Sequence, residues 1–231
     1  MAASITVVTR LDGDGFRLID RCKLAPANKL ILGREGDVNI GVDPADPGIS
    51  RQAVAVVREP MGWAVSATNR NGVVVHPWGQ SSFPANVPQI LPWSHVALRI
   101  LGSGSQQHWA LLEDPSLRIF QHVEQPGITK ATPRPKSLTF VQEQTVRTMF
   151  RELLAWPPRI PATPLQLKQV AARLDTTNES IQRRLEQVRR KAALIGFSRI
   201  GSLSDPEYVY VLVRAGYLTI TTEDIDPLLA H

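Results

Sequence analysis

The stretch Leu32-Gly33-Arg34-Glu35-Gly36-Asp37-Val38-Asn39-Ile40 sets the interpretation of the first half of this chain. Two further turns follow it, Ile49-Ser50-Arg51-Gln52-Ala53 and Asn71-Gly72-Val73-Val74-Val75. The first turn offers a guanidinium, the second a hydroxyl and the third a side-chain amide, and each group can hold an anionic oxygen. Because all three turns lie between short β-prone runs, they predict a phosphate receptor carried on loops.

Residues 4 to about 120 have the pattern of a β domain. Short apolar and β-branched runs recur there, and turns rich in Asp, Asn, Pro and Gly separate them. Many short strands at this spacing predict a β-sandwich whose end loops are free to carry function. The expected strands are Ile5–Val8, Phe16–Ile19, Leu30–Leu32, Val54–Val57, Trp63–Val65, Val73–Val75, Val96–Ile100 and Trp109–Leu112.

A break in composition separates the two halves of the chain. Residues 123–136 are rich in proline and small polar residues, which predicts an extended, semi-rigid linker. Thr129 and Thr132 lie in it, either as plain linker residues or as phosphorylation sites that drive self-association or mask the phosphate receptor. We therefore place the domain boundaries at 1–122 and 137–231.

Residues 137–231 change to helical periodicity. A first helix carries Val141, Thr145, Met149 and Leu153, with Phe140, Val146 and Phe150 beside them, and should end at Trp156-Pro157-Pro158. A second helix should open at Thr163 with Gln166 completing a capping box, and a third at Thr176 with Glu179. The third has Ile181, Leu185, Val188 and Ala192 as its buried stripe. Two short capped helices joined by a tight turn predict a helix-turn-helix.

The last segment allows two interpretations. Phe197–Ile200 and Tyr208–Val213 have the composition of the two strands of a wing. Ser204-Asp205-Pro206-Glu207 is also a good helix start, and Gly216 is a good stop. We favour a helix over residues 206–215.

The three turn motifs together resemble the forkhead-associated (FHA) domain over about the first 115 residues. That family is an eleven-stranded β-sandwich whose end loops bind phosphothreonine peptides. The resemblance implies that Arg34 is the principal phosphate contact, that Ser50 donates its hydroxyl and that Arg51 adds a further contact. It also implies that Asn71 binds the main chain of the peptide.

Two positions depart from the FHA pattern. Ala53 stands where the family usually has a structural histidine, so another group must hold the binding loops. Arg70 stands where the family usually has serine or threonine. The alternatives for Arg70 are an additional phosphate ligand and a site that has drifted from its original use.

Val170-Ala171-Ala172-Arg173-Leu174, Thr176-Thr177 and Ser180–Leu185 resemble the helix-turn-helix core of bacterial transcription regulators. Asp175 stands where a glycine is usual. The resemblance implies base contacts from Asn178 and Gln182 and phosphate contacts from the arginines of the third helix. The alternative is a helical protein-interaction domain with a solvated basic helix, which Glu179 favours. The expected DNA-binding set is Thr177, Asn178, Gln182, Arg183, Arg184, Gln187 and Arg190.

Composition and charge exclude other classes of protein. Hydrophobic content of 43% and charged content of 20% are ordinary for a soluble domain, and the net charge of +5 mildly favours anionic partners. Cys22 is the only cysteine, so no internal disulfide can form, and no Cys/His cluster has metal-ligand spacing. The N-terminus lacks a signal-peptide pattern and no apolar run approaches about 18 residues. A cytoplasmic protein without membrane contact is expected.

Motifs for catalysis are missing as well. Hydrolase, kinase and nucleotide-binding signatures do not occur. The histidines show no evident carboxylate or nucleophile partner, and structural roles are expected for all of them: His76, His95, His108, His122 and His231. We therefore expect no enzymatic activity and no cofactor.

These patterns predict a two-domain signalling protein. Its FHA sandwich would bind a phosphothreonine on a partner modified by a Ser/Thr kinase, and its helix-turn-helix would bind DNA as a transcription regulator. The alternative is an adaptor or scaffold that uses both domains for protein contacts. Helix-turn-helix proteins commonly dimerise to read paired half-sites, which leaves a homodimer open, although no strong dimerisation segment stands out.

Overall fold

The computed structural model describes residues 3–10, 15–117, 135–195 and 201–229 of the 231-residue chain. The chain divides into two compact units, residues 1–119 and residues 120–230. The expected linker, including Thr129 and Thr132, lies outside the described residues except for Pro135 and Lys136.

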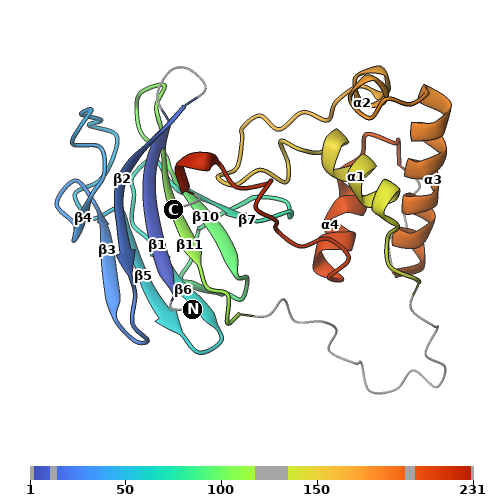
Figure 1. Ribbon diagram of the computed structural model, residues 1–231. Helices are drawn as coiled ribbons and strands as arrows, with labels where there is room; N and C mark the ends of the chain where they lie inside the picture. The colour runs from blue at the N-terminus through green and yellow to red at the C-terminus, as the bar shows by residue number, and fades with distance from the viewer. Residues whose placement is uncertain (1–2, 11–14, 118–134, 196–200, 230–231) are drawn as a thin grey trace. The chain divides into compact units, whose positions relative to one another are not determined.

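The first unit consists of two β-sheets (Figure 1). A six-stranded sheet has the order β2-β1-β11-β10-β7-β8, and a five-stranded sheet has the order β4-β3-β5-β6-β9. The first strand pairs with the last, with Ser4 opposite Glu113. The strands are β1 Ser4–Arg10, β2 Phe16–Lys23, β3 Lys29–Gly33, β4 Val38–Asn39, β5 Val54–Glu59, β6 Gly62–Ala67, β7 Val73–Pro77, β8 Phe83–Pro84, β9 Gln89–Leu91, β10 His95–Ile100 and β11 Gln107–Glu113.

One hydrophobic core serves both sheets, as expected for a sandwich. Alternate side chains point inward, and Ile5 and Leu98 of one sheet share the core with Leu32, Val56 and Trp63 of the other. All eight expected strands are confirmed. Three short strands, β4, β8 and β9, were not predicted, because two or three residues are too few to show a period of two.

The strand register brings four loops to one end of this unit. β3 ends where β5 begins, and Val54 of β5 pairs with Ala67 at the end of β6. Val73 at the start of β7 pairs with Ile100 at the end of β10. The loops 34–37, 40–53, 68–72 and 101–106 therefore meet at the same end, and these are the loops that carry the expected phosphate receptor.

The second unit is helical. Its elements are α1 Phe140–Met149, α2 Leu167–Arg173, α3 Asn178–Ile195, α4 Glu207–Arg214 and the 3-10 helix η1 Pro227–Leu229. Helix α3 packs against α1, α2 and α4. Its predicted core stripe is confirmed, since Ile181, Leu185, Val188 and Ala192 are all fully buried.

Three helix boundaries differ from the prediction. Helix α1 ends at Met149, well before Trp156, because the chain leaves helical geometry at Phe150. Helix α2 begins at Leu167, because Gln166 is extended and forms a capping box with Gln169.

Helix α3 begins one residue later than expected. Its cap is Thr177, whose hydroxyl accepts from the backbone N–H of Ser180 at 3.2 Å. Helix α1 also has a capping box between Thr139 and Gln142, which the sequence analysis missed although the two residues have the usual spacing. The predicted apolar face of α1 is wrong at its start, since Phe140 is 79% exposed and Val141 43% exposed.

The last segment forms a helix, as favoured. Tyr208–Val213 is helical, so the alternative of a second wing strand is wrong there, while residues 197–200 lie outside the described residues. Gly216 ends the helix with a φ of 76°, in the left-handed region that favours glycine.

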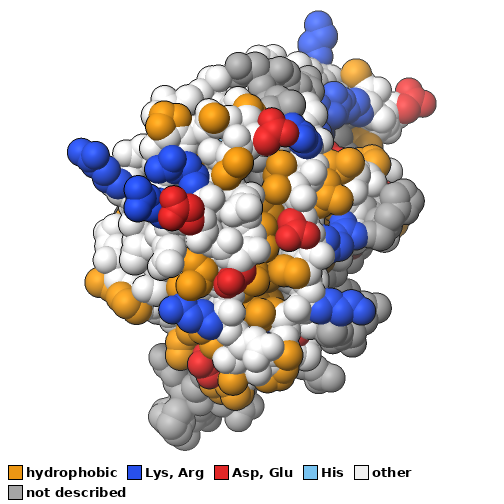
Figure 2. Space-filling model, turned by 90° about the vertical axis from the view of Figure 1, so that its left-hand side faces the viewer, with side chains coloured by type: hydrophobic (Ala, Val, Ile, Leu, Met, Phe, Trp, Pro, Cys, Tyr) orange, Lys and Arg blue, Asp and Glu red, His pale blue; other side chains and the backbone are white. Residues whose placement is uncertain are grey.

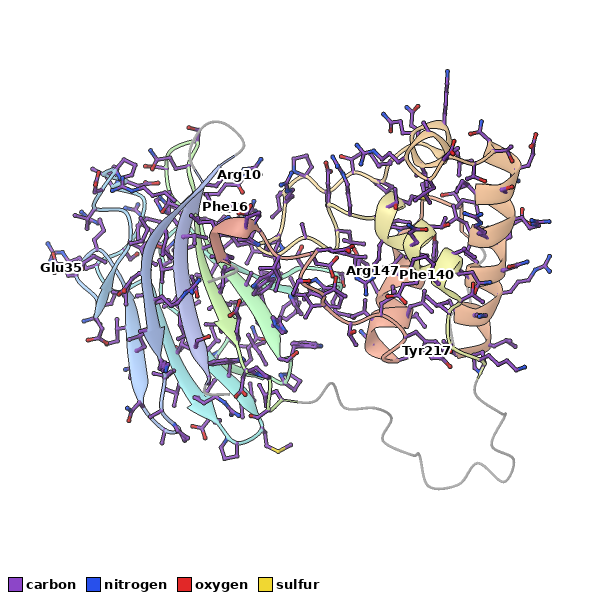
Figure 3. The ribbon with its side chains drawn as sticks, in the orientation of Figure 1. Arg10, Phe16, Glu35, Phe140, Arg147 and Tyr217 are labelled. Atoms are coloured by element: carbon purple, nitrogen blue, oxygen red, sulfur yellow. The ribbon has the colours of Figure 1, made fainter. Side chains whose placement is uncertain are left out.

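The C-terminal segment is part of the helical unit. Arg147 of α1 donates to the Asp224 carboxylate at 2.8 Å and to the Thr219 carbonyl at 2.8 Å. The Tyr217 hydroxyl donates to the Pro135 carbonyl at 2.6 Å, and Figure 3 labels Arg147 and Tyr217 in this unit. In the part of the chain that is described, no helix combines the length and apolar character needed to cross a membrane.

Candidate functional site

Arg34 follows the end of β3, and its side chain is held by one hydrogen bond, from Nε. Its Nε donates to the Ile49 carbonyl at 2.7 Å, and its backbone N–H donates to the Ser50 carbonyl at 3.1 Å. The terminal amino groups are exposed and have no hydrogen-bond partner among the described residues. The guanidinium is thus fixed in place while two of its donors remain free for an anion.

Gly33 allows the end of β3 to lie close to the main chain of residues 51–53. A Cβ at position 33 would collide with the Arg51 carbonyl oxygen and would lie 2.8 Å from the Ala53 nitrogen. Only glycine lets the end of β3 pass so close to the strand entry at 51–53. Gly33 and Arg34 therefore act together: Gly33 lets β3 lie close to the main chain at 51–53, and this close packing places Arg34 at the loop end of the sheet.

Ser50 lies beside Arg34 and is joined to the third loop. Its Oγ accepts from the backbone N–H of Arg70 at 2.9 Å, and its own N–H donates to the Asn69 side chain at 2.9 Å. Because the hydroxyl accepts here, its proton is free to donate to a ligand. The Arg70 side chain therefore starts next to the Ser50 hydroxyl, and it is exposed.

Asn69 was missed by the sequence analysis. Its side-chain amide donates to the Gly72 carbonyl at 2.9 Å and to the Leu101 carbonyl at 2.8 Å, while its oxygen holds Ser50. It is buried, with 8% of its surface exposed. Asn69 therefore ties three loops together, and the signal for it was only one more polar residue in a polar turn.

Asn71 bridges two loops through its amide nitrogen. That atom donates to the Gly48 carbonyl and to the Gly102 carbonyl, at 3.2 Å each. Both of its N–H donors are thus engaged, and its carbonyl oxygen is free to accept. An extended peptide that lies across this loop would offer such an acceptor its backbone N–H groups.

Arg51 forms an exposed ion pair with Glu35, in which Nε lies 3.3 Å from Oε1. Figure 3 shows Glu35 projecting outward from its turn. An exposed pair of this kind contributes about 0–1 kcal/mol, so a competing anion could displace Glu35 at small cost. The loops thus bring together Arg34, Ser50, Arg51, Arg70 and Asn71.

A buried carboxylate lies beneath these loops. Asp46 is 3% exposed, and its Oδ1 accepts from the Gly48 N–H and from the N–H and hydroxyl of Ser103, each at 2.9 Å. Burial alone would raise the pKa of Asp46, but these hydrogen bonds, with one from His108, lower it to about 2. The charge is stabilised by donors and not by a cation.

His108 connects Asp46 to the first strand. Its Nε2 lies 3.2 Å from Oδ2 of Asp46, and its Nδ1 lies 3.1 Å from the Thr9 hydroxyl. Because a carboxylate only accepts, Nε2 carries the proton and Nδ1 accepts from Thr9. Burial lowers the pKa of His108, and this effect outweighs Asp46, which acts to raise it. Burial therefore favours the neutral ring.

This contact corrects the expectation that His108 has no carboxylate or hydroxyl partner. The order of groups is that of a hydrolase triad, but Thr9, His108 and Asp46 are each at most 3% exposed, so no substrate can reach them. In the described ranges, no group of three or more His, Cys, Asp or Glu is arranged to hold a metal ion.

The second candidate surface lies on α3. The turn that precedes it, residues 174–177, has Asp175 at a φ of 45°, the left-handed geometry for which glycine is usual. Arg183 and Arg190 are exposed and form no ion pair within the described part of the chain. Asn178 and Thr177 are exposed at the start of the helix, and Thr177 also caps it.

Three members of the expected DNA-binding set have other surroundings. Gln187 accepts from Nε2 of Gln142 at 2.9 Å and so helps to join α3 to α1. Gln182 donates to Glu186 at 3.3 Å within the helix. Arg184 is only half-exposed. Among the expected set, Asn178, Arg183 and Arg190 are exposed without a side-chain partner in the described part of the chain.

A scan against models of known protein families finds no match for this chain, and a search of curated proteins finds none either. On the face drawn in Figure 2, Lys and Arg side chains lie among Asp, Glu and hydrophobic ones. That face is mixed in charge.

Proposed function

We propose that the first unit binds a phosphothreonine-containing peptide, as an FHA domain does. The observation that carries this proposal is the state of Arg34, whose Nε donates to the Ile49 carbonyl while its terminal amino groups have no partner among the described residues. Its main chain is bonded to Ser50, whose hydroxyl accepts from the Arg70 N–H and can still donate. A dianionic phosphate would accept from both Arg34 and Ser50 in charge-assisted hydrogen bonds.

The surrounding groups fit the same ligand. Arg70 and Arg51 add two more cations, and among the residues that the structure describes Glu35 is the only acidic side chain paired with them. The free carbonyl oxygen of Asn71 suits a peptide backbone. The protein would thus be recruited to a partner after a Ser/Thr kinase has modified that partner.

Arg34→Ala tests this proposal. Loss of a charge-assisted contact costs about 1.5–3 kcal/mol, so affinity for a phosphothreonine peptide library should fall roughly 10- to 150-fold. Arg34→Lys keeps the charge but loses the planar fork, and should bind with intermediate affinity. Lys29→Ala removes the same charge from the other end of β3 and is the control. Unchanged affinity of Arg34→Ala would sink the proposal.

We further propose that α2 and α3 form a helix-turn-helix that binds DNA. The specific observation is the exposed pair Arg183 and Arg190, two turns apart on the face of α3 opposite its buried stripe. The left-handed turn at Asp175 supports the same assignment. Arginines placed in this way would contact phosphates on either side of a groove.

Salt dependence separates this function from a scaffold that makes only protein contacts. If the full chain neutralises four phosphates, its affinity for duplex DNA should fall on the order of 100-fold between about 50 and about 200 mM salt. Replacing Arg183 and Arg190 by Ala should lower the slope by about 2, and Arg214→Ala on α4 is the control. No binding even at low salt would favour the scaffold.

A further inference from the structure

The turn at residues 46–49 supports two of the side chains in the proposed phosphopeptide site. The Ile49 carbonyl accepts from Nε of Arg34 at 2.7 Å. The Gly48 carbonyl accepts from the amide of Asn71 at 3.2 Å. The position of both side chains therefore depends on the position of this turn.

Asp46 fixes the turn from inside. Its carboxylate accepts from the Gly48 N–H at 2.9 Å, and its own carbonyl accepts from the Ile49 N–H at 3.1 Å. The same carboxylate accepts twice from Ser103, next to Gly102, whose carbonyl is the second support of Asn71. Asp46 thus bonds to the residues that carry or adjoin all three supporting carbonyls: its side chain bonds to Gly48 and to Ser103, and its main-chain carbonyl bonds to Ile49.

The loops around Asp46 are tightly packed at two glycines, Gly48 and Gly102. A Cβ on Gly48 would lie 2.7 Å from the amide nitrogen of Asn71 and would collide with the Ser103 nitrogen. A Cβ on Gly102 would collide with the Asp46 carboxylate. The loops cannot shift independently of Asp46, and His108 and Thr9 connect it to β11 and β1.

We infer that Asp46, held by His108, is the positioning residue of the phosphopeptide site. It does the work that a side chain at position 53 cannot do, since Ala53 has no polar group and is fully buried. This inference rests on the proposed function for its ligand, but the positioning itself is measurable without one.

The test uses the full chain labelled for NMR. In the wild-type protein the Nε–H of Arg34 and the side-chain amide of Asn71 should exchange slowly with water. In Asp46→Ala both should exchange at least about tenfold faster. Asp43→Ala removes an exposed carboxylate from the same loop, and it should leave both signals unchanged.

Asp46→Asn separates positioning from charge. Its amide oxygen can still accept from Gly48 and Ser103, and its nitrogen can donate to His108 once the ring changes tautomer. It should therefore stay within about threefold of wild type in exchange, whereas a role for charge alone would make it resemble Asp46→Ala. Gly48→Ala, in a surface loop, should release Asn71 in the same way if Asp46→Ala does not fold.

A phosphothreonine peptide library is the binding probe, with the unphosphorylated library as the blank. The amount of phosphothreonine peptide that Asp46→Ala retains should be at least about fivefold lower than the amount that the wild-type protein retains. If the wild-type protein retains no peptide while the two signals respond as expected, the proposed ligand is wrong and the positioning role stands. Unchanged exchange at Arg34 and Asn71 in both Asp46→Ala and Gly48→Ala would overturn the inference.

Discussion

Replacement of Asn69 by alanine should destabilise the first unit strongly. Three hydrogen bonds of 2.8–2.9 Å would be lost, one from Ser50 and two to the carbonyls of Gly72 and Leu101. The side chain is buried, so water cannot replace these bonds without rearrangement. At about 1 kcal/mol for each bond, the free energy of unfolding should fall by about 3 kcal/mol.

Amide hydrogen exchange at Val56 and Leu98 measures this change within the intact chain. Both residues are fully buried in strands, where exchange requires the unit to open. A loss of about 3 kcal/mol corresponds to exchange about 100-fold faster. Asn71→Ala is the matched control, because it removes two longer bonds from an exposed side chain and should have an effect below about fivefold. An equally small effect of Asn69→Ala would refute the reasoning.

Three further outcomes are expected. Asp175→Gly should stabilise the helical unit by about 0.5–1 kcal/mol in thermal unfolding, because glycine adopts a φ of 45° without strain; a loss of stability would contradict this. The pKa of Asp46 is about 2 against an ordinary 3.8, so the ionised carboxylate stabilises the folded state fully above about pH 4 and loses this effect as the pH falls to about 2. The free energy of unfolding should fall by roughly 2 kcal/mol over this pH range, and Asp46→Asn should abolish this pH dependence. Arg147→Ala should cost about 2–3 kcal/mol in thermal unfolding because it removes the cation that pairs with the buried Asp224 carboxylate and leaves only the donors of Thr221 among the described residues, whereas exposed Arg151→Ala should stay within about 0.5 kcal/mol; equal effects would contradict the network.

Local patterns predicted the strands well because each strand carries its own signal, either alternation as in β5 or a continuous apolar and β-branched run as in β1. Val54–Val57 and Trp63–Val65 are strands for reasons that lie within a few residues. The supports of the loops have no such signature. Asp46 looks like a turn residue in the sequence, and its partner His108 is 62 residues away, so only the fold brings them together.

The start of α2 shows the same limit in a helix. Thr163 with Gln166 is the better capping pattern on paper, because a capping box usually has Ser or Thr at its first position, yet the helix begins after Gln166. The choice is made by contacts from elsewhere in the unit, since Glu152 accepts from the Thr163 N–H and the Met149 carbonyl accepts from the Leu165 N–H. These two bonds hold the chain extended until Gln166. A capping rule considers only four neighbouring residues, so it cannot include bonds to Glu152 and Met149.

The order in which the chain is synthesised matters for both units, because each is closed by its last segment. Strand β1 obtains its second neighbour only when β11 has been made, and α1 obtains its contacts with Thr219 and Asp224 only after α4 is complete. At about 5–20 residues per second, the more than 100 residues between β11 and Asp224 take roughly 5–20 seconds to synthesise. During that interval the first unit can fold on the ribosome, and its loops can meet a ligand before the helical unit exists.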